Sequence, residues 1–176
     1  MRLSEGIEWG LHCAVVLAAL PAGAALPARA LAEFHGVSPS YLLKHLKAMV
    51  AGGVLESVPG ARGGYRLARP ADTITLLDVV LAVEGGEPAF RCTEIRRRGP
   101  VPGPKAQYRA PCTIKVAMLR AESAWRDALR GQTVAELLAI VGRIADPAST
   151  REKARWLSQH VRGAHGAAAA IDVTEG

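Results

Sequence analysis

Apolar residues recur every three to four positions along most of the chain, and this spacing predicts a mainly helical protein. The first helix is expected over residues 5–20, with Ser4 as its N-cap and with Pro21 and Gly23 ending it. Later segments repeat the pattern, and they predict a short helix that begins at Pro27, then helices over residues 38–51, after Thr75, over 112–130 and 133–144, and around 151–161.

The short helix at Pro27 and the next helix are typical of a helix-turn-helix. The turn "HGV" separates them, and the second helix has Ser38 as its cap and Pro39 as its first residue, which suits both residues. Two strand-like runs, "VLESV" and "YRLAR", then flank the glycine-rich "PGARGG", as in a β-hairpin. A hairpin in this place is a wing. The predicted fold is mainly α with a small β-hairpin wing: a winged helix-turn-helix plus a long dimerisation helix.

The distribution of charge indicates what kind of partner this fold binds. The net charge is +6, and residues 91–109 contain six Lys or Arg residues against Glu94 alone. Such a balance suits a polyanion, nucleic acid first and a membrane surface second. Three cysteines are too few for a secreted disulfide scaffold. The run "CAVVLAALPAGAAL" follows acidic residues and is too short to span a bilayer, so we expect a cytoplasmic protein that does not enter a membrane.

Double-stranded DNA is the expected partner of the second helix. Hydroxyl, lysine and aromatic side chains reach phosphates and base edges, and the positions expected to be exposed are Ser38, Ser40, Tyr41, Lys44, His45 and Lys47. Arg62 at the wing tip is placed to enter a minor groove, with Arg66 nearer the phosphates. The alternative is that these are ordinary solvated charges. Specific binding by one winged helix usually requires a homodimer, and the apolar stripe from Ile114 to Leu129 is either its interface or intradomain core.

Four residues fit no structural role predicted so far. Glu8 and His12 lie one helical turn apart on the first helix, close enough to bind one metal centre. Cys92 and Cys112 bracket the irregular basic loop, and two thiolates need two further ligands to complete a four-ligand site. Alternatives remain at this point: His12 as a core residue, Glu8 near solvent, and the two cysteines as a reversible disulfide or a zinc site.

Three segments resemble a known family. "MRLSEGIEWGLHCAVVL", "VSPSYLLKHLKAMVAGGVLESVPGARGGYRLARP" and "ITLLDVVLAVEG" look like the winged-helix iron–sulfur regulators that include IscR, NsrR and RsrR, over about residues 1–138. Most cluster-binding members carry three closely spaced loop cysteines, whereas this chain has two, which matches the RsrR-like type. That resemblance implies a 2Fe–2S cluster held by Glu8 and His12 of one subunit and by Cys92 and Cys112 of the other. Trp9, beside Glu8, is then a candidate redox lever.

The expected function is a DNA-binding transcriptional regulator, a repressor, that senses redox state through this cluster. The alternative is an iron-free winged-helix regulator switched by a Cys92–Cys112 disulfide, zinc or a small effector. An enzyme is not expected, because the chain shows no strained nucleophile turn, phosphate loop or carboxylate pair. The expected organisation is a DNA-binding domain, a cluster-binding loop, dimerisation helices and a partly disordered Ala/Gly-rich tail, over residues 1–84, 85–111, 112–145 and 146–176.

Overall fold

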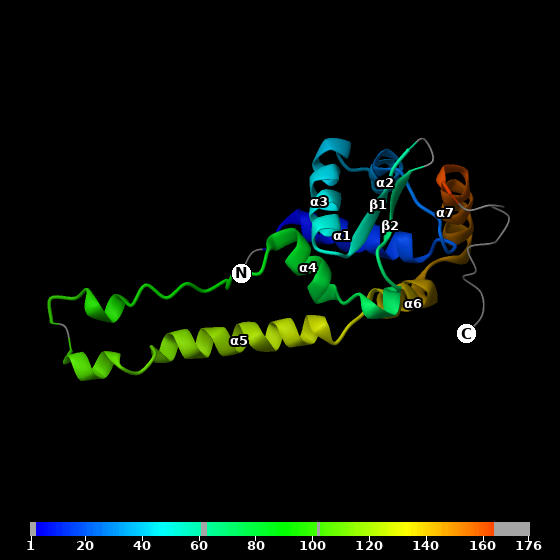
Figure 1. The fold of residues 1–176 in the computed structure, drawn as a ribbon. Helices are drawn as coiled ribbons and strands as arrows, with labels where there is room; N and C mark the ends of the chain where they lie inside the picture. Colours follow the sequence, from blue (N-terminus) through cyan, green and yellow to red (C-terminus); the bar gives the residue numbers. More distant parts are fainter. Residues whose placement is uncertain (1–2, 61–62, 102, 164–176) are drawn as a thin grey trace.

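The computed structural model describes residues 3–60, 63–101 and 103–163, and it divides into a body and an arm (Figure 1). The body contains four helices of the N-terminal half, and two more that return to it after the arm: α1 (Glu5–Ala18), α2 (Ala28–His35), α3 (Pro39–Ala51), α4 (Leu76–Glu84), α6 (Val134–Ile144) and α7 (Pro147–His160). The hairpin consists of β1 (Leu55–Val58) and β2 (Gly64–Leu67), which pair antiparallel with Leu55 opposite Leu67. The prediction of a mainly helical winged helix-turn-helix with a β-hairpin wing is confirmed.

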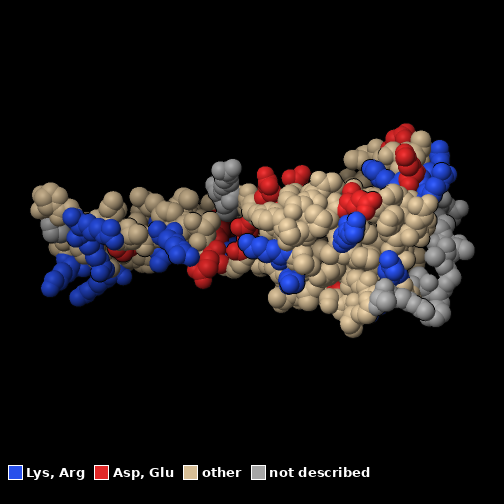
Figure 2. Space-filling view, turned by 90° about the horizontal axis from the view of Figure 1, so that it is seen from above, with Lys and Arg blue, Asp and Glu red and all other residues tan. Residues whose placement is uncertain are grey.

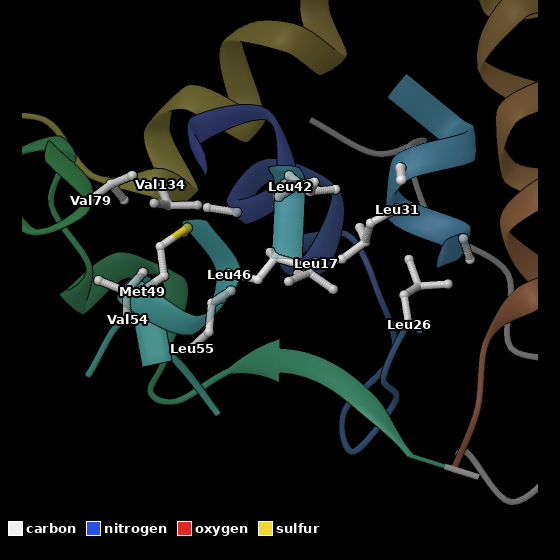
Figure 3. Packing of buried hydrophobic residues seen from close by; sticks show 14 of the residues in the cluster. Leu17, Leu26, Leu31, Leu42, Leu46, Met49, Val54, Leu55, Val79 and Val134 are labelled. Atoms are coloured by element: carbon white, nitrogen blue, oxygen red, sulfur yellow. The ribbon is translucent and has the colours of Figure 1, made fainter. Parts of the chain in front are cut away.

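Apolar faces of α1, α3 and α4 meet in the centre of the body (Figure 3). Leu42, Leu46 and Met49 of α3 are fully buried, and Val79 of α4 and Val134 of α6 pack in the same cluster. Burial of each such side chain contributes about 1.5–3 kcal/mol to stability. The core therefore fixes α3 against α1, which leaves the opposite side of α3 exposed.

Local signals in the sequence explain where the helices begin and end. Gly36 ends α2 in a left-handed conformation (φ 65°), and Pro39 begins α3. A capping box begins α4: the Asp78 amide donates to the Thr75 hydroxyl, and the Thr75 amide donates to the Asp78 carboxylate. These signals define the end of α2 and the starts of α3 and α4.

The arm, residues 85–130, consists of the loop after α4 and of α5 (Thr113–Arg130), and it projects from the body (Figure 1). Two short 3-10 helices, η2 (Ile95–Arg97) and η3 (Lys105–Tyr108), lie at its far end. Arg126 ties the loop to α5 by donating to the Gly86 carbonyl (3.2 Å). No residue of α5 is buried, and its exposed apolar side chains are Ile114, Val116, Met118 and Leu119.

The last described helix, α7, packs on the body. Asp146 caps it by accepting from the Ser149 amide (2.7 Å), so the helix begins before the residue expected from the sequence. Leu157 lies in the core, and Arg162 pairs with Ala25 through two backbone hydrogen bonds of 2.9 Å. Residues 164–176 of the expected tail lie outside the described part of the chain. Across the described ranges, no helix combines the length and apolarity needed to cross a bilayer.

Candidate functional site

Glu8 and His12 are both exposed on α1, so neither is a core residue. They line an apolar groove of about 960 Å³ between α1, α6 and α7. The His12 ring lies 5.7 Å from that of His35, measured between centroids. The pKa of His35 is lowered to about 4, mainly by burial and further by His12 and Lys153. The predicted ligand pair thus faces outward, beside a neutral imidazole.

Cys92 and Cys112 come together at the far end of the arm. One ligand atom from each of Cys92, Glu94 and Cys112 lies within 4.8 Å of the others. Cys92 Sγ is 3.6 Å from Glu94 Oε1, and Cys112 occupies the N-cap position of α5. Nineteen residues separate the two cysteines in sequence, and the loop that they form brings its two ends together.

The cysteine side chains differ in their surroundings, and these surroundings shift the pKa values of Cys112 and Cys13 in opposite directions. Backbone N–H groups of Lys115 and Ile114 hold the pKa of Cys112 below its ordinary value, against partial desolvation, and Arg96 adds to the effect. Burial raises the pKa of Cys13 to about 12. Cys112 is thus suited to be a thiolate ligand, while Cys13 is a small core residue.

The two ligand pairs do not meet within one chain. Glu8 and His12 lie on the body, whereas Cys112 begins α5 at the far end of the arm (Figure 1). Within the described residues, the group of metal-ligating side chains around the cysteines contains neither Glu8 nor His12. A site that uses all four residues requires a second subunit.

The exposed face of α3 carries most of the predicted DNA-binding side chains. The exposed side chains among them are Ser38, Ser40, Tyr41, Lys44 and Lys47. The prediction that His45 is exposed is wrong: the side chain is 6% exposed because it fills the space above Gly6. Its ring and that of Tyr41 lie edge-on to Trp9, with centroids 6.1 and 5.2 Å away. Trp9 of α1 thus contacts two side chains of α3.

The wing differs in part from the expectation. Arg62 lies outside the described residues. Arg66 is half-buried and forms an ion pair with Glu56 across the hairpin. A paired guanidinium is less available to a phosphate than a free one, so Arg66 supports the hairpin in this state. Lys and Arg side chains gather instead at the end of the arm (Figure 2).

Sequence reasoning missed Glu94 as a neighbour of both cysteines. Glu94 lies two residues after Cys92 in sequence, and its backbone is left-handed (φ 50°) where its side chain approaches the thiols. Such a conformation is uncommon outside glycine and has no marker in the residue itself. The groove beside His12 was also missed, because α6 and α7 come to α1 from the other end of the sequence.

Comparison with known proteins places the chain in a family. Residues 3–140 match the model of the Rrf2 family, described as an iron-dependent transcriptional regulator. YwgB of Bacillus subtilis, whose name describes an HTH-type transcriptional regulator, is 29% identical over 163 residues, covering 93% of this chain and 99% of YwgB. YffB of Lactococcus lactis, of the same class by name, is 42% identical over 48% of this chain and 54% of its own.

Solved structures agree on the fold. T. potens IscR superposes with a TM-score of 0.61 at 20% identity, covering 85% of this chain and 96% of that one. CymR, the global cysteine regulator of B. subtilis, has a TM-score of 0.60 at 21% identity, covering 80% and 98%. The oxidized form of Staphylococcus aureus CymR has a TM-score of 0.57 at 28% identity, covering 78% and 96%. With the winged helix, these matches show that the chain belongs to the Rrf2 family and is a DNA-binding transcriptional regulator rather than an enzyme.

Proposed function

We propose that this protein is a homodimeric repressor that senses redox state through a 2Fe–2S cluster. Cys92 and Cys112 of one subunit hold the cluster together with Glu8 and His12 of the partner subunit. One observation carries the proposal: two thiols meet at the end of an arm that reaches away from the exposed Glu8–His12 pair of its own chain.

The donor set fits such a cluster. Thiolates are the usual ligands of iron–sulfur clusters, and imidazole replaces them where the reduction potential is raised. The lowered pKa of Cys112 favours the thiolate form needed for ligation. His12 and Glu8 are exposed, so both can bind a cluster that the cysteines of another subunit hold. Cys13 is buried and takes no part.

A dimer also explains the bare apolar surface of the arm. Ile114 is 63% exposed and Val116 is 52% exposed, although both lie on a helix of eighteen residues with no buried position. The groove beside His12 is lined mainly by apolar residues of α1 and α6. Packing the arm of one subunit against the body of the other removes both surfaces from water, which stabilises the dimer.

Coupling to DNA runs through α1. The bound cluster supplies a one-electron change of charge next to Glu8 and His12. Trp9 lies between these two ligands in the sequence and contacts Tyr41 and His45 of α3. A small rotation of α1 therefore moves the exposed side of α3. This coupling requires that the two redox states differ in operator affinity.

Anaerobic reconstitution tests the proposal. We expect a coloured protein with about two irons and two sulfides per subunit, and a loss or change of its spectrum in Glu8→Ala, His12→Ala, Cys92→Ala and Cys112→Ala. Cys13→Ala is the matched control and keeps the wild-type spectrum. Operator affinity at fixed salt then differs between oxidised and reduced protein. A colourless wild type, or equal affinities, contradicts the proposal.

The proximity of Cys92 and Cys112 favours a second candidate, an iron-free regulator with a disulfide switch. An oxidant would accept two electrons and two protons from the thiols as the S–S bond forms. A thiol count on iron-free protein, before and after mild oxidation, distinguishes this candidate, because it predicts the loss of two of the three thiols.

A further inference from the structure

Cys92, Glu94 and Cys112 are spaced for a metal site within a single chain. The 3.6 Å between Cys92 Sγ and Glu94 Oε1 is close to the edge of about 3.6 Å that joins a sulfur and an oxygen ligand in tetrahedral zinc coordination. All three ligand atoms lie within 4.8 Å of one another. Small side-chain rotations therefore suffice to bring them around one ion.

The backbone of Glu94 directs its carboxylate to the thiols. It has φ 50° and ψ 47°, and no other non-glycine residue of the described ranges has a positive φ. A left-handed glutamate is strained, and such strain persists where the surroundings fix it, often at functional sites. The left-handed conformation therefore indicates a specific role for the Glu94 carboxylate.

Arg96 orients the carboxylate. Its guanidinium donates to Glu94 Oε2 (2.8 Å), and the other oxygen is the one that faces Cys92. Arg96 is itself held over the Tyr108 ring, 5.6 Å from the centroid, and the Tyr108 hydroxyl donates to the Arg96 carbonyl (3.0 Å). Carboxylate ligands of metals are commonly fixed by such outer hydrogen bonds.

We propose that Cys92, Glu94 and Cys112 of one chain bind a thiophilic divalent cation of the zinc class, with water at the fourth position, when no cluster is present. Metal binding displaces the thiol protons to solvent. Glu8 and His12 take no part, so the site is complete in one chain and does not rest on the proposed function. Because both sites use the same thiolates, the cation and the cluster exclude one another.

Co²⁺ is the probe that tests this site. Added anaerobically to the reduced, iron-free full chain, it gives the absorption bands of tetrahedral cobalt–thiolate coordination at one ion per chain, and Zn²⁺ displaces it. Glu94→Gln weakens Co²⁺ binding at least about tenfold. Glu94→Asn does the same, although asparagine tolerates a left-handed backbone, so relief of strain is not the cause. Glu87→Gln, an exposed acid of the same loop, and Glu8→Gln bind Co²⁺ as the wild type does.

Wild-type affinity in both Glu94 variants overturns the proposal. So does one Co²⁺ per two chains with loss of binding in Glu8→Gln, because the site would then be shared. Circular dichroism of each variant shows whether it is folded. Failure of the cluster proposal looks different: the reconstituted protein stays iron-free while Co²⁺ binding and its dependence on Glu94 remain.

Discussion

Gly6 and His45 show how one small residue sets the contact between α1 and α3. A Cβ atom at position 6 would lie 2.3 Å from Cε1 of His45, far inside van der Waals contact. The His45 ring therefore occupies the space that Gly6 leaves open, and it packs edge-on to Trp9. Nε2 of His45 is buried with no hydrogen-bond partner among the described residues. His45 thus helps to hold Trp9 in place rather than reaching for DNA.

Gly6→Ala is expected to destabilise the protein by about 1–3 kcal/mol, because the new methyl group overpacks the contact and must displace the ring. Denaturant unfolding measures the change. Gly86→Ala is the control, since a Cβ there meets no atom within 4 Å. Equal stability of Gly6→Ala and wild type would show that α1 and α3 are not tightly packed at this point.

Among the helices of the body, α3 presents two exposed lysines on its outer face. Lys44 and Lys47 are exposed, and within the described ranges neither forms an ion pair, whereas Arg66 of the wing is paired with Glu56. Free cations on an exposed helix are the groups that replace counterions on DNA. We therefore expect Lys44 and Lys47 of α3 to contribute to the electrostatic part of DNA binding.

Lys44→Gln and Lys47→Gln are each expected to weaken operator binding and to make the slope of log K against log salt less negative by about 0.9. Fluorescence anisotropy over a salt series measures both quantities. Arg143→Gln on α6, at the other end of the body, is the matched charge control. An unchanged slope in both lysine variants would remove α3 from the DNA interface.

The start of α4 makes stability depend on pH. Partial burial raises the pKa of Asp78, but hydrogen bonds from Thr75 and the ion pair with Arg69 (2.9 Å) outweigh it, and the net pKa lies below its ordinary value. A lowered carboxyl pKa contributes stability that is present above the unfolded value of about 3.9 and is lost as the pH falls through the folded value.

Asp78→Asn is therefore expected to lower stability at pH 7 and to flatten its fall below about pH 4. Urea unfolding at a series of pH values tests this, with the exposed Asp72→Asn as control. Parallel pH profiles for wild type and Asp78→Asn would contradict the assignment.

In the molecule as a whole, the sequence predicted the features that depend on residues close to one another in the chain. The helix-turn-helix and the wing were confirmed because their signals are local: Gly36 ends α2 and Pro39 begins α3, although the Ser38 side chain makes no cap hydrogen bond. His45 was misplaced because helical spacing does not reveal the opening left by Gly6. Glu94 was missed because its contact depends on a left-handed backbone. The proposed contact between the arm of one subunit and the body of another involves two chains, so local signals in the sequence cannot predict it, and only the family resemblance suggested it.

A mixed dimer shows whether two subunits share each cluster. One tagged chain carries Glu8→Ala and His12→Ala, and a second, differently tagged chain carries Cys92→Ala and Cys112→Ala. In the mixed dimer, the cysteines of the first chain face the intact Glu8 and His12 of the second. Each homodimer lacks a complete ligand set.

We expect the isolated mixed dimer, reconstituted anaerobically, to contain one cluster, that is, about two irons and two sulfides per dimer, with the wild-type spectrum at half intensity. The two variant homodimers stay without that spectrum. If the wild type is coloured but the mixed dimer lacks the spectrum, two subunits do not share each cluster, because each cluster then draws its ligands from one chain.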